Sequence, residues 1–148
     1  MQPISTVQDT VIVEFGSFLL AEFPETTRGW RPDLRDDRII RSAGSGSTYL
    51  LSGGTDHYPH VSVEVCPAEP EVPVGWERID EDEDVFSRPV LRLHSVTSQL
   101  GARAIKLPAA GRWRIRAASS GRADVQRLGE ASFAEGVERW LLQLWPVA

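Results

Sequence analysis

The sequence predicts an all-β fold, namely a single-domain antiparallel β-sandwich of about seven or eight strands with long polar loops and at most short helical turns. Two observations predict it. In residues 112–117 arginines and apolar residues alternate strictly, and several other short runs are rich in β-branched and aromatic residues between Gly- and Pro-containing turns. At 148 residues the chain is long enough to bury one core without disulfides or metals, so residues 1–148 are expected to form one domain.

The segment 107–117 shows the strand pattern most clearly. It turns at residues 108–111 and then alternates, so side chains two positions apart share a face of the strand. The face expected to be buried comprises Trp113, Ile115 and Ala117, and the face expected to be solvated comprises Arg112, Arg114 and Arg116. Glutamates on a neighbouring strand, such as Glu64, are expected to pair with these arginines.

The first half of the chain predicts three strand regions. Residues 10–23 form one long strand with a bulge or two short strands, because Gly16 and Ser17 interrupt a β-branched and aromatic run. Residues 24–46 are expected to be a long loop, and strands are expected at 47–52 and 60–66, joined as a hairpin. Three prolines make residues 67–73 a surface connection.

The second half predicts four further strands. A short strand at 76–79 precedes an acidic run at 80–84, and strands follow at 90–96 and 104–107, the latter pairing with the strand after it. Residues 121–136 are small and polar, with room for helical turns. The closing segment 137–145 is predicted as a strand because aromatic residues flank it and Pro146 ends it.

The composition narrows the classes of partner and compartment. The net charge of −5 argues against a nucleic-acid partner, and no apolar run is long enough to cross a membrane. The single cysteine, Cys66, cannot form an internal disulfide, and the N-terminus lacks the pattern of a signal peptide. A cytoplasmic protein without a cofactor is therefore expected, with a homodimer through an exposed sheet edge left open.

The acidic run at 80–84 is the most unusual local feature. Such a run is most often a solvated loop, and its spacing lacks the glycine and distal glutamate of an EF-hand calcium loop. A third interpretation is an anionic surface that imitates the phosphate backbone and occupies the basic cleft of a nuclease. The candidate partner-binding residues are Trp76, Glu81, Asp82, Glu83 and Asp84.

Two alternatives from other classes stay open. One is a sandwich that binds a sugar or another small ligand in a loop pocket, with Trp30, Tyr49, His57 and Tyr58 as candidate contacts. The other is a metal-dependent enzyme at His57 and His60, with His94 as a further ligand. The sequence has no Gly-x-Ser-x-Gly turn and no phosphate-loop lysine, and no base lies next to Cys66, so no catalytic or metal residues are assigned.

The order of several short segments resembles the competence protein J family, small bacterial proteins that inhibit a partner DNA-entry nuclease. The segments are Ile12-Val13-Glu14-Phe15-Gly16-Ser17-Phe18, Trp30 in a polar loop, Ser47-Thr48-Tyr49, the alternating residues 61–65, Val85-Phe86, and Leu107-Pro108-x-x-Gly111-x-Trp113-x-Ile115. The tail at 140–146 is more similar to uncharacterised actinobacterial β-sandwich proteins. The resemblance implies a non-enzymatic sandwich whose acidic loops bind a nuclease, and it carries over no individual site residues.

Overall fold

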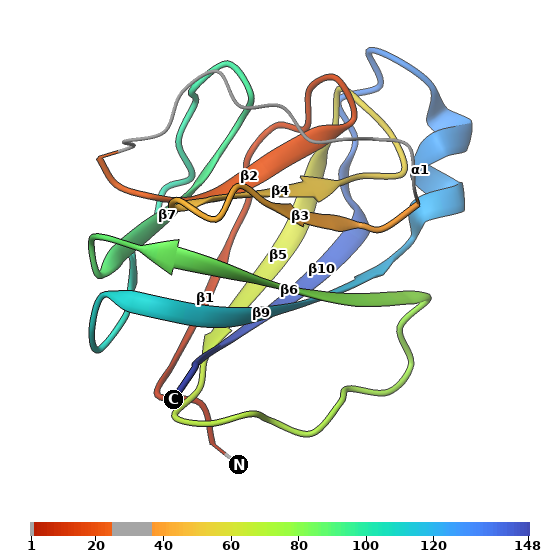
Figure 1. Ribbon diagram of the computed structural model, residues 1–148. Coiled ribbons are helices and arrows are strands. Elements are labelled where there is room, and N and C mark those ends of the chain that lie inside the picture. Colours follow the sequence, from red (N-terminus) through yellow and green to blue (C-terminus); the bar gives the residue numbers. More distant parts are fainter. Residues whose placement is uncertain (1, 25–36) are drawn as a thin grey trace.

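In the part of the chain that the structure describes, ten β-strands form two sheets that pack against each other, and there is one short helix (Figure 1). The computed structural model describes residues 2–24 and 37–148. The elements are β1 (Ser5–Asp9), β2 (Ser17–Glu22), β3 (Ile40–Ser42), β4 (Ser47–Leu51), β5 (Tyr58–Val65), β6 (Arg78–Phe86), β7 (Val90–His94), β8 (Ile105–Lys106), β9 (Gly111–Ser120), α1 (Arg122–Leu128) and β10 (Glu135–Pro146).

The first sheet has the strand order β1-β5-β10-β9-β6, and the second has the order β3-β4-β2-β7-β8. Neighbouring strands run antiparallel except β5 and β10, which are parallel. The predicted all-β sandwich is therefore confirmed, with more strands than expected and one parallel pair. Helix α1 packs beside β10 at one end of the sandwich (Figure 1).

The core lies between the sheets and follows the period-two pattern of the strands. The predicted inward faces of β5 and β9 are buried, as are alternate residues of β2 and β7. The ring of Phe18 on β2 meets that of Trp140 on β10 edge to face, with centroids 5.3 Å apart and an interplanar angle of 87°. This aromatic contact joins the two sheets at their centres.

Several predicted connections were wrong because they depend on distant partners. Strands β4 and β5 do not form a hairpin, since they belong to different sheets. Strand β8 pairs with β7 rather than with β9. Strand β1 was not predicted at all; its short polar sequence is a strand because it adds to the edge of β5.

The acidic run is not a loop but the middle of β6, a nine-residue strand paired with β9 along its whole length. Other local predictions were confirmed, including the strand at β4 and the helical turns of α1. Within the described ranges, no helix is long and apolar enough to cross a membrane.

Candidate functional site

The acidic residues of β6 divide between its two faces, as strand geometry requires. Asp80, Asp82 and Asp84 form what we call the carboxylate row, which points toward the second sheet. Asp80 Oδ2 accepts a hydrogen bond from the backbone N–H of Ile39 at 3.0 Å, and Asp82 Oδ2 accepts one from Ser42 at 3.0 Å. The row thus attaches β3 to the edge of the first sheet.

Asp84 ends the row and is buried. Its Oδ2 accepts a hydrogen bond from Thr48 Oγ1 at 2.7 Å, and its Oδ1 accepts one from the Gly46 N–H at 2.9 Å. Burial raises the pKa of the Asp84 carboxyl, and these hydrogen bonds partly offset that shift. The carboxylate therefore lies between the sheets and does not face a partner.

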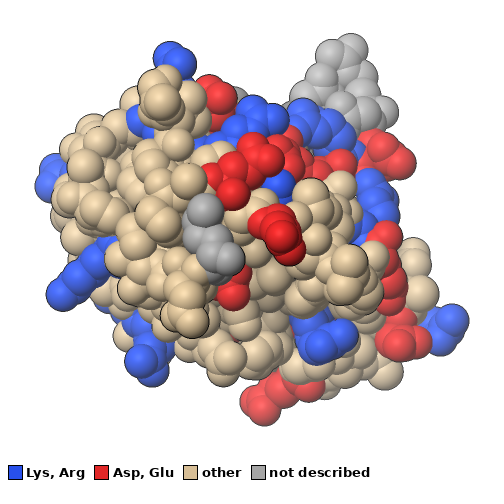
Figure 2. Space-filling model, turned by 90° about the horizontal axis from the view of Figure 1, so that it is seen from below, with Lys and Arg blue, Asp and Glu red and all other residues tan. Residues whose placement is uncertain are grey.

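The opposite face of β6 carries Glu81 and Glu83, which pair with arginines of β9. We call this set the charge ladder; its members are Glu81, Glu83, Arg112, Arg114 and Arg116. Arg116 Nε lies 2.9 Å from Glu81 Oε2, and Arg114 bridges the two acids, with Nε 3.3 Å from Glu81 Oε1 and Nη1 3.5 Å from Glu83 Oε1. Arg112 Nε lies 3.7 Å from Glu83 Oε2. Figure 2 shows acidic and basic side chains interleaved on one face of the molecule.

Arg116 departs from the predicted solvated face because it is buried. Its Nη1 donates to the Pro70 carbonyl at 3.0 Å and to Gln143 Oε1 at 3.2 Å, and its guanidinium lies over the Trp145 ring, 4.9 Å from the centroid. The predicted partner Glu64 instead accepts a hydrogen bond from Gln143 Nε2 at 3.0 Å. The segment 67–77 covers this end of the ladder, so the arginine serves packing as well as charge.

Trp76, the predicted anchor, is half-buried just before β6. The guanidinium of Arg139 lies 5.5 Å from the centroid of its ring. One side of the indole therefore contacts the fold itself.

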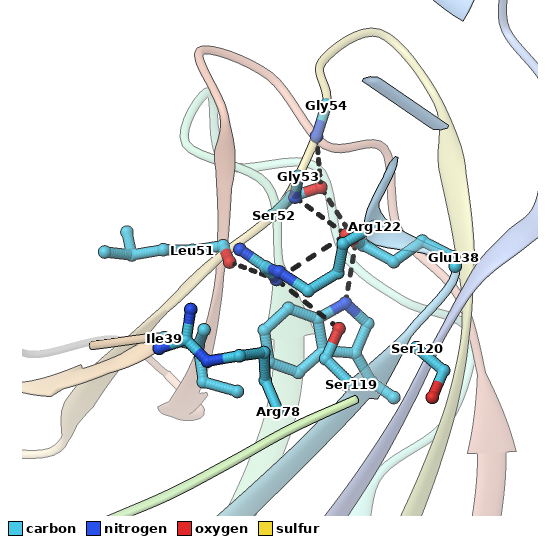
Figure 3. Close-up of polar contacts among 12 residues, drawn as sticks. Ile39, Leu51, Ser52, Gly53, Gly54, Arg78, Ser119, Ser120, Arg122 and Glu138 are labelled. Atoms are coloured by element: carbon cyan, nitrogen blue, oxygen red, sulfur yellow. Dashed lines mark hydrogen bonds and ion pairs between the residues drawn. The ribbon is translucent and has the colours of Figure 1, made fainter. Parts of the chain in front are cut away.

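A second polar site lies buried beside α1 and β10 (Figure 3). Glu138, which is fully buried, accepts hydrogen bonds through Oε1 from Ser52 Oγ and Trp140 Nε1, each at 2.7 Å. Its Oε2 accepts one from the Gly53 N–H at 2.7 Å and lies 3.7 Å from Arg122 Nη1. This arrangement satisfies a buried carboxylate, which would otherwise be strongly destabilising.

His57 completes this site but does not form a catalytic relay. Its Nε2 lies 2.8 Å from Ser52 Oγ, whereas its Nδ1 has no partner among the described residues. Because Ser52 donates its proton to Glu138, Nε2 of His57 donates to Ser52. In a catalytic Ser-His-acid relay the carboxylate would accept a hydrogen bond from Nδ1 of the histidine. Glu138 does not do so here, and His57 therefore does not activate Ser52. Burial lowers the pKa of His57, against the opposing effect of Glu138.

The structure does not gather the predicted metal-ligating histidines. His57 is buried beside Glu138, His60 is exposed on β5, and His94 is buried in the second sheet. In the part of the chain that the structure describes, no three His, Cys, Asp or Glu residues are placed to hold a metal ion. The metal-enzyme alternative therefore loses its site.

The aromatic residues predicted to bind a small ligand are also separated. Tyr58 lines a pocket of about 440 Å³ together with His60 and Glu135, whereas Tyr49 lies on β4 and does not line this pocket. Trp30 lies outside the described residues.

The sequence analysis missed a larger pocket, of about 600 Å³, at the end of the sandwich next to α1. We call it the end pocket. It is lined by residues 14–16, 52–56, 125–126 and 129–130. The dipeptide Phe15-Gly16 is the sequence signal that marks it, because this pair forms a tight turn in which an aromatic side chain projects into solvent.

Comparisons with known proteins agree on the fold. No protein-family model and no curated protein matches the chain. Among solved structures, ComJ from Bacillus subtilis, described as an inhibitor of the DNA degrading activity of NucA, is similar with a TM-score of 0.62 and 10% identity, over 99% of this chain and 98% of that one. The protein of crocagin biosynthetic gene J is similar with a TM-score of 0.61 and 14% identity, over 98% of this chain and 100% of that one. The resemblance predicted from the sequence is confirmed as a likeness of fold: this chain has the two-sheet architecture of ComJ along nearly its whole length.

Proposed function

We propose that this protein is a non-enzymatic inhibitor that binds a nuclease and blocks its access to DNA. The observation that carries the proposal is the similarity of fold to ComJ over 99% of this chain and 98% of that one. ComJ is described as an inhibitor of a DNA-degrading activity.

The buried site fits a structural role rather than a catalytic one. Ser52 is the one hydroxyl placed between a histidine and a carboxylate in this site, yet it donates to Glu138 instead of being deprotonated by His57. The site is enclosed by hydrogen bonds to the backbone and to Trp140. These contacts fit a structural network that holds two loops and β10 together.

The acidic contact surface predicted from the sequence stays a proposal, with Asp84 removed from it. Trp76, Glu81, Asp82 and Glu83 keep accessible atoms, whereas Asp84 is buried. A basic nuclease would approach the charge ladder through the glutamates, exchanging their pairing with Arg112 and Arg114 for its own cations. Such exposed charges act mainly on the association rate and its salt dependence.

The experiment is an affinity capture from the native cell extract at low and moderate salt, followed by a DNA-degradation assay on what is retained. The expected result is a nuclease whose activity falls to zero as the full chain reaches equimolar amount. Retained proteins whose DNA degradation the chain does not reduce would contradict the proposal.

Glu83→Gln tests the ladder without disturbing the buried contacts. Its side chain is 40% exposed, and the amide keeps its size. If the ladder contacts the partner, the variant slows association severalfold at low salt, and Glu135→Gln, an equal charge change elsewhere on the surface, does not. Equal association rates for the two variants would remove the ladder from the interface. A variant that replaces Glu81, Asp82, Glu83 and Asp84 together is unsuitable, because Asp84 holds the two sheets together.

A further inference from the structure

We propose that the end pocket receives an arginine or lysine side chain of the protein partner, with Phe15 as the apolar contact beside it. This inference rests on the proposed function, because it names a second contact of the inhibitor with its nuclease, in addition to the charge ladder.

One exposed apolar side chain, that of Phe15, lines the pocket, and two more belong to segments next to its lining residues. Phe15 is 86% exposed, and Leu128 and Phe133 are 48% and 55% exposed. Phe15 lines the pocket, Leu128 precedes the lining residue Gly129, and the Phe133 N–H donates to the carbonyl of Asp56 at 2.8 Å. An exposed aromatic side chain at a concavity is typical of protein contact sites.

The charged side chains of the pocket are all acidic. They are Glu14, Asp56 and Glu130, and among the residues that the structure describes no lysine or arginine lines the pocket. None of the three forms an ion pair with a described residue, in contrast to the glutamates of the charge ladder. An incoming cation therefore meets negative charge that the described residues do not neutralise by ion pairs, which favours a basic side chain.

Two of these carboxylates are held in place. Glu14 Oε1 accepts a hydrogen bond from Thr97 Oγ1 at 2.6 Å, and Asp56 Oδ2 accepts one from the Ala131 N–H at 2.9 Å. Each still has a second oxygen available to a ligand. Fixed acceptors lower the entropy cost of binding.

The walls of the pocket are also rigid. Glu14 and Ser17 exchange backbone hydrogen bonds of 3.3 and 3.2 Å around Phe15 and Gly16, both of which have positive φ values. This is a two-residue turn of the primed type, which ordinarily uses Asn or Gly at its first position. An aromatic residue there is costly, and such strain points to a use for the side chain.

The opposite wall is fixed by the buried site. The Gly53 N–H donates to Glu138, and a Cβ at Gly53 would lie 2.6 Å from the carbonyl oxygen of Arg122. Helix α1 therefore packs directly on the glycine backbone at this wall of the pocket.

The first arm of the test uses a defined probe and does not need the nuclease. A capped peptide, Gly-Ser-Arg-Ser-Gly, is titrated into the full chain labelled with ¹⁵N, with the citrulline peptide as the uncharged control. We expect saturable shifts of the Gly16, Gly53 and Gly129 amides with the arginine peptide alone. The double variant Glu14→Gln/Glu130→Gln should bind about tenfold more weakly, whereas Glu71→Gln/Glu135→Gln should bind as the wild type does. Absence of these shifts, or equal shifts with citrulline, would overturn the proposal.

The second arm uses the nuclease recovered with the full chain. The Glu14→Gln/Glu130→Gln variant should inhibit DNA degradation at least tenfold less well than the wild type, and Glu71→Gln/Glu135→Gln should inhibit equally well. Undiminished inhibition by the pocket variant would overturn the pocket while leaving the inhibitor function standing. Peptide binding at the pocket without inhibition of any nuclease would uphold the pocket and overturn the inhibitor function.

Discussion

The carboxylate of Asp84 on β6 accepts a hydrogen bond from the hydroxyl of Thr48 on β4 at 2.7 Å, in the buried space between the two sheets. One face of β6, whose sequence suggested an anionic surface, thus forms hydrogen bonds that connect the two sheets. Its other face is neutralised by arginines of β9. Substitutions on the two faces of β6 can therefore distinguish the exposed glutamates from the buried Asp84.

Asp84→Ala should lower the free energy of unfolding by about 3 kcal/mol, because the Thr48 hydroxyl and the Gly46 N–H lose a buried acceptor. Urea unfolding followed by tryptophan fluorescence measures this. Glu83→Ala on the exposed face of the same strand should cost less than about 1 kcal/mol. Equal losses for the two variants would show that the carboxylate row does not fasten the sheets.

Gly121→Ala should be far more damaging than Gly129→Ala, although both glycines have positive φ values. A Cβ at Gly121 would lie 2.1 Å from the carbonyl oxygen of Val137, whereas one at Gly129 meets no atom within 4 Å. We expect a loss of about 2 kcal/mol at Gly129 from backbone conformation alone, because its φ of 70° and ψ of −168° lie in a region essentially restricted to glycine, and at least about 2 kcal/mol more at Gly121. Thermal unfolding of both variants is the measurement, and similar midpoints would contradict it.

His57 should make the stability of the protein depend on pH. Burial lowers its folded pKa, so below the ordinary histidine pKa of about 6.5 the unfolded chain binds a proton that the folded chain resists. The contribution of neutral His57 to stability is complete above that value and is lost as the pH falls below it. Between pH 7.5 and pH 5.5 the wild type should therefore lose more unfolding free energy than the His57→Gln variant does. Parallel pH profiles in urea unfolding would refute this.

Phe15→Asn should stabilise the fold by about 1 kcal/mol while weakening partner binding. Asparagine adopts the left-handed conformation of the first turn position readily, whereas Phe15, with φ 54°, does so at a cost. Phe15→Val is the matched control, because a β-branched residue at this position should destabilise the turn. Calorimetry of the three proteins checks the order, and a less stable Asn variant would mean that the Phe15 ring contributes to packing.

The local pattern of the sequence predicted which side chains enter the core. Trp113 and Ile115 on β9, and Val61 and Val63 on β5, are buried as expected because alternation along a strand is a property of the backbone itself. Alternation did not reveal the strand at residues 80–84. Both of its faces are acidic there, so the sequence shows no change between polar and apolar residues.

The tertiary structure alone decided which strands are neighbours and which surface remains open. The parallel pairing of β5 with β10 and the separation of β4 from β5 depend on contacts between residues far apart in the chain, for which one sequence contains no local signal. The same holds for the end pocket, which forms only when Glu14, Asp56 and Glu130 arrive from three segments. The sequence by itself determined the strand faces and the all-β class, because these follow from local backbone geometry. Long-range packing decided the pairing order of the strands, the ion pairs of the charge ladder and the acidic lining of the end pocket.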